Sequence, residues 1–253
     1  MFLTSHDDTR IYYELHNPDA AGTPLLLTHG FRATSAMWDA NVAALSADRP
    51  VLTYDQRGHG QSDAPATVEG YSEERNVGDI AALANLLGDR VIIGGMSLGG
   101  YLSMAYHLAH PDRVAALLLQ DTGPGYKSDA AREKWNERVE QLAQEAESGD
   151  VGAQNGSVEV RRAVHRDPSA IARVARGVLR QRDARVIEHL PTIAVPTLVV
   201  VGADDVNYLS GTDYLASRIP GARKEVIADA GHAASIDQPE RFNAVVTDWL
   251  TTL

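Results

Sequence analysis

The sequence predicts an α/β fold in which a mostly parallel central sheet is covered by helices on both faces. Three observations predict it. Short runs that are apolar throughout recur along the chain, as in strands buried on both faces. These runs alternate with segments of helical periodicity, which is typical of a doubly covered parallel sheet. Residues 122–191 interrupt this alternation with helical patterns alone, so a small helical insertion is expected there.

The predicted strands have apolar interiors bounded by glycine, proline or charged residues. The first, TRIYYEL at 9–15, alternates in polarity like an edge strand, and the next, PLLLTHG at 24–30, is apolar and ends in His-Gly. The remaining strands are predicted at 49–55, 90–96, 113–121, 195–205 and 223–232. Ligands of open α/β sheets bind at the carboxyl ends of strands, so residues following these strands are candidates for a site.

Helices are predicted between the strands. The segment 71–88 has an N-cap candidate in Ser72 and a stop signal in Gly88. The helix over 97–111 is halted by Pro111. Further helices are predicted at 35–47, 128–150, 168–190 and 239–252.

Two of these helices fall within residues 122–191, which separate a core made of residues 1–121 and 192–253. We expect the insertion to form a cap over the carboxyl ends of the strands, because that is where pockets of such sheets lie. The alternative is a set of surface helices with no role in the site.

Charge and cysteine content exclude several classes of function. The net charge of −11 repels phosphate backbones and anionic lipid, so neither nucleic acid nor a membrane surface is an expected partner. The chain has no cysteine, which excludes disulfides, thiolate zinc sites and a cysteine nucleophile. The N-terminus turns polar by residue 4, unlike a signal peptide, and no apolar run approaches membrane-spanning length. A cytoplasmic protein is therefore expected, as a monomer or homodimer.

Ser97 is the candidate nucleophile. The stretch IIGGMSLGGY at 92–101 places this serine in a Gly-x-Ser-x-Gly pattern where a predicted strand runs directly into a predicted helix. Glycines at 95 and 99 allow strand and helix to approach closely, and a serine on such a sharp turn is exposed at a helix N-terminus. The alternative is an N-cap serine in a glycine-rich packing turn.

A serine nucleophile requires a base, and the base requires a group that orients it. His232 follows a predicted strand at the sheet edge where Ser97 is expected, whereas His59, in DQRGHGQSD, is the rival base. Asp204 and Asp205 both follow the strand TLVVVG and qualify as the orienting carboxylate.

Acyl transfer also needs two donors for the negative charge that develops on the carbonyl oxygen. The backbone amide of Leu98, directly after the nucleophile, is one candidate. The amide of Phe31, in the loop after the strand PLLLTHG, is the other.

Several stretches together resemble the α/β-hydrolase superfamily over nearly the whole chain except the insertion. These stretches are LLLTHGF, YDQRGHGQSD, GGMSLGGYLSMAYHLAHPDRV, VPTLVVVGADD and AGHAASIDQPERFN. The resemblance is closest to small capped members, which include 3-oxoadipate enol-lactonases, carboxylesterases, cofactor-free haloperoxidase-type perhydrolases and carbon–carbon bond hydrolases. It implies the order Ser97, Asp205, His232, because the acid of this family sits three residues after the strand-ending Gly202.

The resemblance implies a serine hydrolase that cleaves an ester or lactone of a small to medium acyl substrate, without metal or cofactor. Epoxide hydrolases and haloalkane dehalogenases are excluded because they use aspartate where this chain has Ser97. Two alternatives remain: carbon–carbon hydrolysis or perhydrolysis by the same triad, and a ligand-binding receptor on a hydrolase scaffold.

The substrate pocket is the least determined part of the prediction. Arg32 is a candidate for binding a substrate carboxylate. The alternative that we favour is an arginine that is either solvated in its loop or paired with an acid of the insertion. Met96, Tyr126 and Trp135 are candidates for an apolar lining, and packing residues are the alternative. Tyr101 and Tyr208 are further candidates of the same kind.

Overall fold

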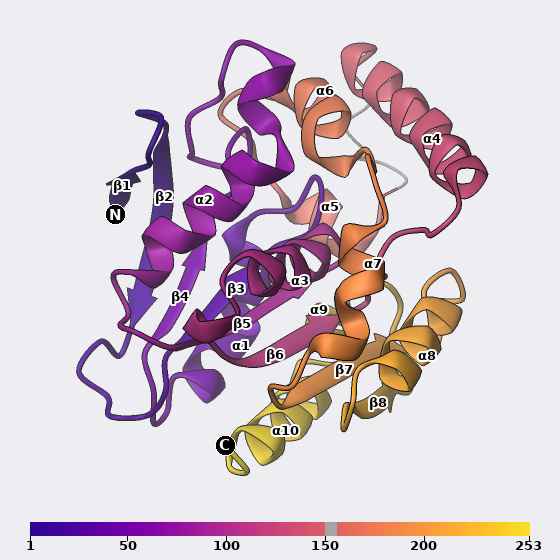
Figure 1. Ribbon diagram of the computed structural model, residues 1–253. Coiled ribbons are helices and arrows are strands. Elements are labelled where there is room, and N and C mark those ends of the chain that lie inside the picture. The colour runs from indigo at the N-terminus through magenta and orange to yellow at the C-terminus, as the bar shows by residue number, and fades with distance from the viewer. Residues whose placement is uncertain (150–155) are drawn as a thin grey trace.

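The computed structural model describes residues 1–149 and 156–253. Its centre is an eight-stranded sheet with the order β1-β2-β4-β3-β5-β6-β7-β8 (Figure 1). The β1–β2 and β2–β4 pairs are antiparallel, and the remaining pairs are parallel. The strands are β1 (Phe2–Thr4), β2 (Arg10–His16), β3 (Leu25–Thr28), β4 (Val51–Tyr54), β5 (Val91–Met96), β6 (Val114–Gln120), β7 (Thr197–Gly202) and β8 (Arg223–Ile227). The predicted mostly parallel sheet is thus confirmed; the short β1 was not predicted.

The central parallel strands β3 to β7 are buried on both faces, as their apolar sequences require, whereas the edge strand β8 is partly exposed. Every residue of β3, β4, β5 and β7 is buried. The register aligns Thr28 with Gly95 and Met96 with Gln120, so the carboxyl ends of β3, β5 and β6 lie at one edge. The loops after these strands therefore meet at that edge.

Helices cover both faces of the sheet (Figure 1). One face packs against α2 (Glu73–Ala84) and α3 (Leu98–Ala109), and the other against α1 (Asp39–Leu45) and α10 (Pro239–Leu250). Alternate residues of a strand point to opposite faces. Accordingly Leu26 belongs to the first apolar cluster, while Leu25 and Leu27 belong to the second.

Local sequence explains the start of α2 better than its end. The Ser72 side chain accepts a hydrogen bond from the Arg75 amide, which confirms the predicted N-cap. The helix ends at Ala84, earlier than predicted, and turn hydrogen bonds then carry the chain to Gly88, which has a φ of +134°.

Helices also fill the described part of the insertion between β6 and β7. They are α4 (Asp129–Glu147), α5 (Val158–Arg162), α6 (Ala170–Val174), a π-helical turn (Ala175–Leu179) and α7 (Arg185–His189). Between Gln120 and Thr197 the structure describes no strand outside residues 150–155, in agreement with the sequence.

The helix predicted over 168–190 is interrupted. The chain leaves the helical conformation at Arg180, which is extended. The Asn136 side chain then takes both polar backbone groups of Gln181: it donates to the carbonyl oxygen at 2.9 Å and accepts from the amide at 2.9 Å. A continuous helix would use those groups itself. The predicted division into core and cap stays a prediction.

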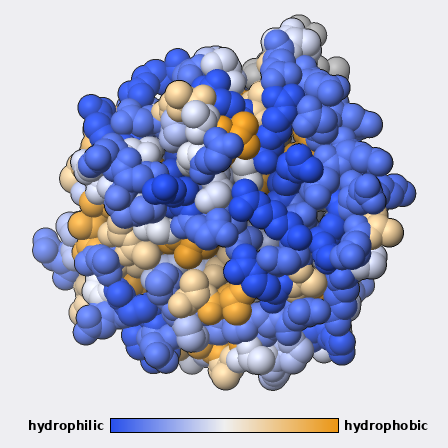
Figure 2. Space-filling model, turned by 45° about the horizontal axis from the view of Figure 1, so that its top comes forward, coloured by the Kyte–Doolittle hydropathy of each residue, from blue (hydrophilic) through white to orange (hydrophobic). Residues whose placement is uncertain are grey.

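The surface agrees with the composition. In the ranges 1–149 and 156–253, no helix has both the length and the apolar character needed to cross a membrane. The face shown in Figure 2 is mostly hydrophilic, with hydrophobic surface only in small areas.

Candidate active site

Ser97 occupies a strained turn between β5 and α3. Its φ is +53° and its ψ −116°, a conformation that side chains other than glycine rarely adopt. A Cβ atom on Gly95 would lie 2.4 Å from the carbonyl carbon of Gly99, and one on Gly99 would lie 2.3 Å from the Thr28 carbonyl oxygen. The glycines therefore allow β5, α3 and β3 to meet where Ser97 is presented.

His232 and Asp205 form a hydrogen-bonded pair beside this turn. The distance between His232 Nδ1 and Asp205 Oδ2 is 2.7 Å. Asp205 follows β7, and His232 lies in the loop between β8 and the short helix α9 (Ala234–Asp237). Of the two candidate acids Asp205 is buried, whereas Asp204 is exposed and uses its amide to bind the Ala230 carbonyl at 2.9 Å. The structure thus brings Asp205 to His232.

Nearby carboxylates raise the pKa of His232 above its ordinary value. Burial alone would lower this pKa, but the hydrogen bond and the charge of Asp205, with smaller contributions from Asp121 and Glu159, outweigh it. Asp121 is fully buried after β6 and accepts from the Gly202 amide at 2.8 Å. Burial raises the pKa of Asp121 to about 7.

Tyr208 lies against His232 and lines the same cavity as Ser97. Its ring lies 4.6 Å from the His232 ring, measured between centroids. Burial raises the pKa of the Tyr208 hydroxyl. Ser97, Tyr208 and His232 line one cavity of about 380 Å³.

Each of the two expected oxyanion donors, Phe31 and Leu98, lines a cavity that Ser97 also lines. In the described chain, neither the Leu98 nor the Phe31 amide donates to another protein group. The loop that carries Phe31 is held at its next residue, since the Arg32 amide donates to His59 Nε2 at 3.2 Å and His165 Nε2 lies 3.1 Å from the Arg32 carbonyl oxygen.

The rival base His59 has a different environment from His232. It is fully buried, and its ring nitrogens face backbone groups of Arg32 and Arg57. Burial, together with the neighbouring His29 and His165 rings, lowers its pKa well below the ordinary value. His59 lines neither of the cavities that Ser97 lines.

A second cavity of about 580 Å³ also reaches Ser97. All the side chains proposed for a substrate pocket line one or both cavities. Arg32 and Met96 line the smaller; Tyr101 and Tyr126 line the larger; Trp135 and Tyr208 line both.

The Arg32 guanidinium faces the insertion. It donates to the Leu142 carbonyl at 2.9 Å, lies 3.7 Å from Glu145 Oε2 and sits over the Phe31 ring at 5.3 Å. This is the arrangement expected from the alternative interpretation, an arginine paired with an acid of the insertion. Glu145 in turn binds Arg138 at 2.9 Å.

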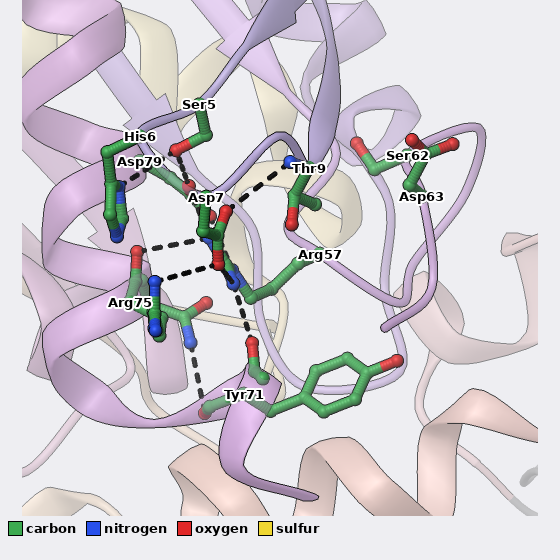
Figure 3. Close-up of polar contacts among 12 residues, drawn as sticks. Ser5, His6, Asp7, Thr9, Arg57, Ser62, Asp63, Tyr71, Arg75 and Asp79 are labelled. Carbon is green, nitrogen blue, oxygen red and sulfur yellow. Dashed lines mark hydrogen bonds and ion pairs between the residues drawn. The ribbon is translucent and has the colours of Figure 1, made fainter. Parts of the chain in front are cut away.

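One group outside this site has the side chains of a metal site, namely His6, Asp7 and Asp79. Figure 3 shows the Arg57 guanidinium between the two carboxylates. It lies 2.6 Å from Asp79 and 2.9 Å from Asp7. Burial alone would raise the pKa of Asp7, but hydrogen bonds from Arg57 lower it. The Arg57 guanidinium thus already supplies the positive charge between these carboxylates. The ion pairs join the N-terminal segment, which carries Asp7, to α2, which carries Asp79.

Two residues of the site were not predicted. Asp121 follows the strand VAALLLQ as Asp205 follows TLVVVG, so its position at a strand end was an available signal. Glu159 is a buried carboxylate in the smaller cavity, carried by the five-residue helix α5, and no motif in the sequence marks it.

Known proteins resemble this chain over its full length. A thermophilic esterase from Thermogutta terrifontis is 29% identical, with a TM-score of 0.82 over 100% of this chain and 98% of that one. An enol-lactonase from Burkholderia xenovorans LB400 is 27% identical, with a TM-score of 0.81 over 99% of this chain and 100% of that one. A putative 2-succinyl-6-hydroxy-2,4-cyclohexadiene-1-carboxylate synthase of Bacillus subtilis is 26% identical over 99% of this chain and 98% of its own.

The family model for alpha/beta hydrolases matches residues 25–245, which is most of the chain. This match agrees with the sheet order and with the strand–turn–helix around Ser97. The chain therefore belongs to the α/β hydrolase family.

Proposed function

We propose that this protein is a serine hydrolase that cleaves a carboxylic ester or lactone through an acyl-enzyme on Ser97. The observation that carries the proposal is the 2.7 Å bond between His232 Nδ1 and Asp205 Oδ2 beside the strained Ser97 turn. This bond leaves His232 Nε2 as the nitrogen available to accept a proton. The esterase and enol-lactonase names of two relatives support an ester or lactone as the bond cleaved.

In the first half-reaction, Ser97 Oγ attacks the carbonyl carbon while its proton passes to His232 Nε2. The amides of Phe31 and Leu98 donate to the oxygen on which negative charge develops, each contributing about 3 kcal/mol. The tetrahedral intermediate expels the alkoxide, which takes the proton from His232. In the second half-reaction, His232 deprotonates a water that attacks the acyl-enzyme, and the released Ser97 oxygen recovers the proton.

The proposal predicts turnover of p-nitrophenyl acetate, butyrate or octanoate that depends on Ser97. Turnover should fall to background in Ser97→Ala and His232→Ala. Ser97 Oγ should attack the phosphorus of a fluorophosphonate and displace fluoride, with the Oγ proton passing to His232. Peptide mass spectrometry detects the resulting phosphonyl adduct at that residue. Negligible turnover of all three esters, or an adduct elsewhere, would contradict the proposal.

Asp204 and Asp205 provide a matched pair of variants. Asp205→Asn should lower kcat by up to ~10⁴, because the imidazole loses the group that orients it. Asp204→Asn should have nearly normal kcat, since its side chain is exposed. A His59→Ala variant as inactive as His232→Ala would instead point to His59 as the base, provided that both variants melt like the wild-type protein.

A further inference from the structure

The two cavities that meet at Ser97 differ in chemical character. The smaller is lined by His232, Glu159 and the charged pair Arg32 and Glu145. The larger is lined mainly by apolar and aromatic side chains, among them Tyr101, Tyr126 and Val178, with Gln181, Asn207 and Ser210 as polar members. Trp135, Arg138 and Leu179 line both cavities. A substrate bound at Ser97 therefore has a polar side and an apolar side.

The proposed reaction decides which part of the substrate lies on which side, and this inference rests on that proposed function. The leaving oxygen takes its proton from His232, and His232 lines the smaller cavity. Of the two expected oxyanion donors, Phe31 lines the smaller cavity and Leu98 lines the larger one, which lies away from His232. The leaving group thus belongs in the smaller, polar cavity, and the acyl chain in the larger.

Glu159 is the unusual feature of the polar cavity. Its side chain is almost fully buried, at 3% exposure. Oε1 accepts a hydrogen bond from the Ser157 hydroxyl, but Oε2 is buried with no partner. An unpaired carboxylate oxygen in such a place is costly, because it has lost water and gained nothing in return.

The cations of the cavity do not satisfy this oxygen. Arg32 lies 3.7 Å from Glu145, and Arg138 binds Glu145 at 2.9 Å. Within the part of the chain that the structure describes, Glu159 has no ion-pair partner. A ligand in the cavity that Glu159 lines would supply the missing donor, and a charged donor forms the strongest hydrogen bond to a carboxylate.

We propose that Glu159 forms a leaving-group subsite that binds a protonated amine, so that the preferred substrates are apolar acyl esters of amino alcohols. Glu159 accepts the N–H of the ammonium group while the ester carbonyl lies at Ser97. In this arrangement Glu159 is a specificity-determining residue. It takes no part in bond breaking.

The test compares esters that share one acyl group and differ in the leaving group. Dimethylaminoethyl butyrate carries an N–H donor and a positive charge, and 3-methylbutyl butyrate is its neutral isostere. Butyrylcholine carries the charge without the donor. The kcat/KM for the first should exceed that for the isostere by about tenfold or more, the value of one charge-assisted hydrogen bond.

Glu159→Gln should reduce this ratio to nearly one, because the amide keeps the shape of the side chain and loses its charge. Using a ratio cancels any change in the His232 pKa, which affects both esters equally. Glu145→Gln is the matched control: this second acid of the same cavity is already paired with arginine, so the ratio should persist. Melting temperatures of both variants verify folding.

The outcomes separate this inference from the proposed function. Turnover of p-nitrophenyl butyrate that requires Ser97, combined with equal kcat/KM for the amine ester and its isostere, overturns the subsite alone. A preference that survives Glu159→Gln also overturns it. If kcat/KM for butyrylcholine equals that for dimethylaminoethyl butyrate, the cavity recognises the positive charge alone. That result would overturn the proposed N–H bond to Glu159. If p-nitrophenyl butyrate is not hydrolysed, the proposed function itself fails.

Discussion

The His232 side chain is surrounded by negative charge. Asp205 binds its Nδ1 directly, and Asp121 and Glu159 act on it through their charges. Each stabilises the imidazolium, which in the proposed reaction forms when Ser97 gives up its proton. The same charges hold the pKa of His232 above its ordinary value, so at lower pH the ring is protonated and cannot act as a base.

This arrangement predicts a pH dependence with a definite sign. Activity requires neutral His232, so kcat/KM should fall as the pH drops through the raised pKa of that residue. Asp121→Asn removes one of the negative charges that raise the pKa, and should move the acid limb to lower pH. The rate of p-nitrophenyl butyrate cleavage is followed at the isosbestic wavelength between about pH 5 and about pH 9. This measures the acid limb of the wild-type protein and that of Asp121→Asn. An acid limb that Asp121→Asn leaves in place would show that the buried carboxyl is already neutral and does not act on His232.

The elements around the site are held together by backbone contacts between distant segments. His165, in the insertion, faces the Arg32 carbonyl oxygen with Nε2 and accepts from the Gly60 amide at 3.0 Å with Nδ1. The Arg166 amide binds the Gly60 carbonyl oxygen at 2.9 Å. The insertion therefore contacts both the loop that carries Phe31 and the loop after β4.

His165 is accordingly predicted to position the oxyanion loop. His165→Ala should lower kcat about tenfold with little change in KM, because the Phe31 amide acts on charge that exists only in the transition state. The decrease in kcat should be smaller than the decrease expected if the Phe31 amide were lost. The reason is that His59 still accepts from the Arg32 amide and so still holds the loop. Arg166→Ala, at a half-exposed neighbour that pairs with Asp63 on the surface, is the control and should keep normal kcat. A rise in KM with unchanged kcat in His165→Ala would mean that the residue only shapes substrate binding.

In the whole molecule, the insertion and the sheet share packing. Ala170, Val174 and Val178 belong to the apolar cluster of the sheet and α3. Ile171 and Ala175, on the same short stretch, pack against α4. One helical segment thus contributes to both cores, which couples their folding.

This coupling predicts a single thermal transition. The calorimetric and van't Hoff enthalpies should agree, as they do for cooperative domains. Val174→Ala, which removes a fully packed side chain where the clusters meet, should lower the single melting temperature and cost about 2 kcal/mol without splitting the transition. Two resolved transitions would show that the insertion unfolds as a separate unit.

Local sequence patterns accounted for much of the fold. Sequence patterns predicted seven of the strands. Apolar runs predicted β3 to β7, because a strand buried on both faces must be apolar along its length, whereas alternating polarity predicted β2. The three-residue β1 is too short for such a pattern, and α8 (Leu209–Arg218) was not predicted. The helix over 168–190 was predicted as continuous, since Asn136, which takes the backbone groups of Gln181, lies 45 residues away in sequence.

For the site, the sequence by itself determined Ser97 and its glycines, because a strand–turn–helix is a local structure with a local pattern. It also limited the partners of Ser97 to residues that follow strands, with His232 favoured by its position, and the family resemblance selected Asp205 over Asp204. Only the tertiary structure decided that Asp205 contacts His232, that His165 contacts the loop that carries Phe31 and that Glu159 lies buried in the smaller cavity. These contacts join segments far apart in the chain, and periodicity and motif spacing carry no information about such distances.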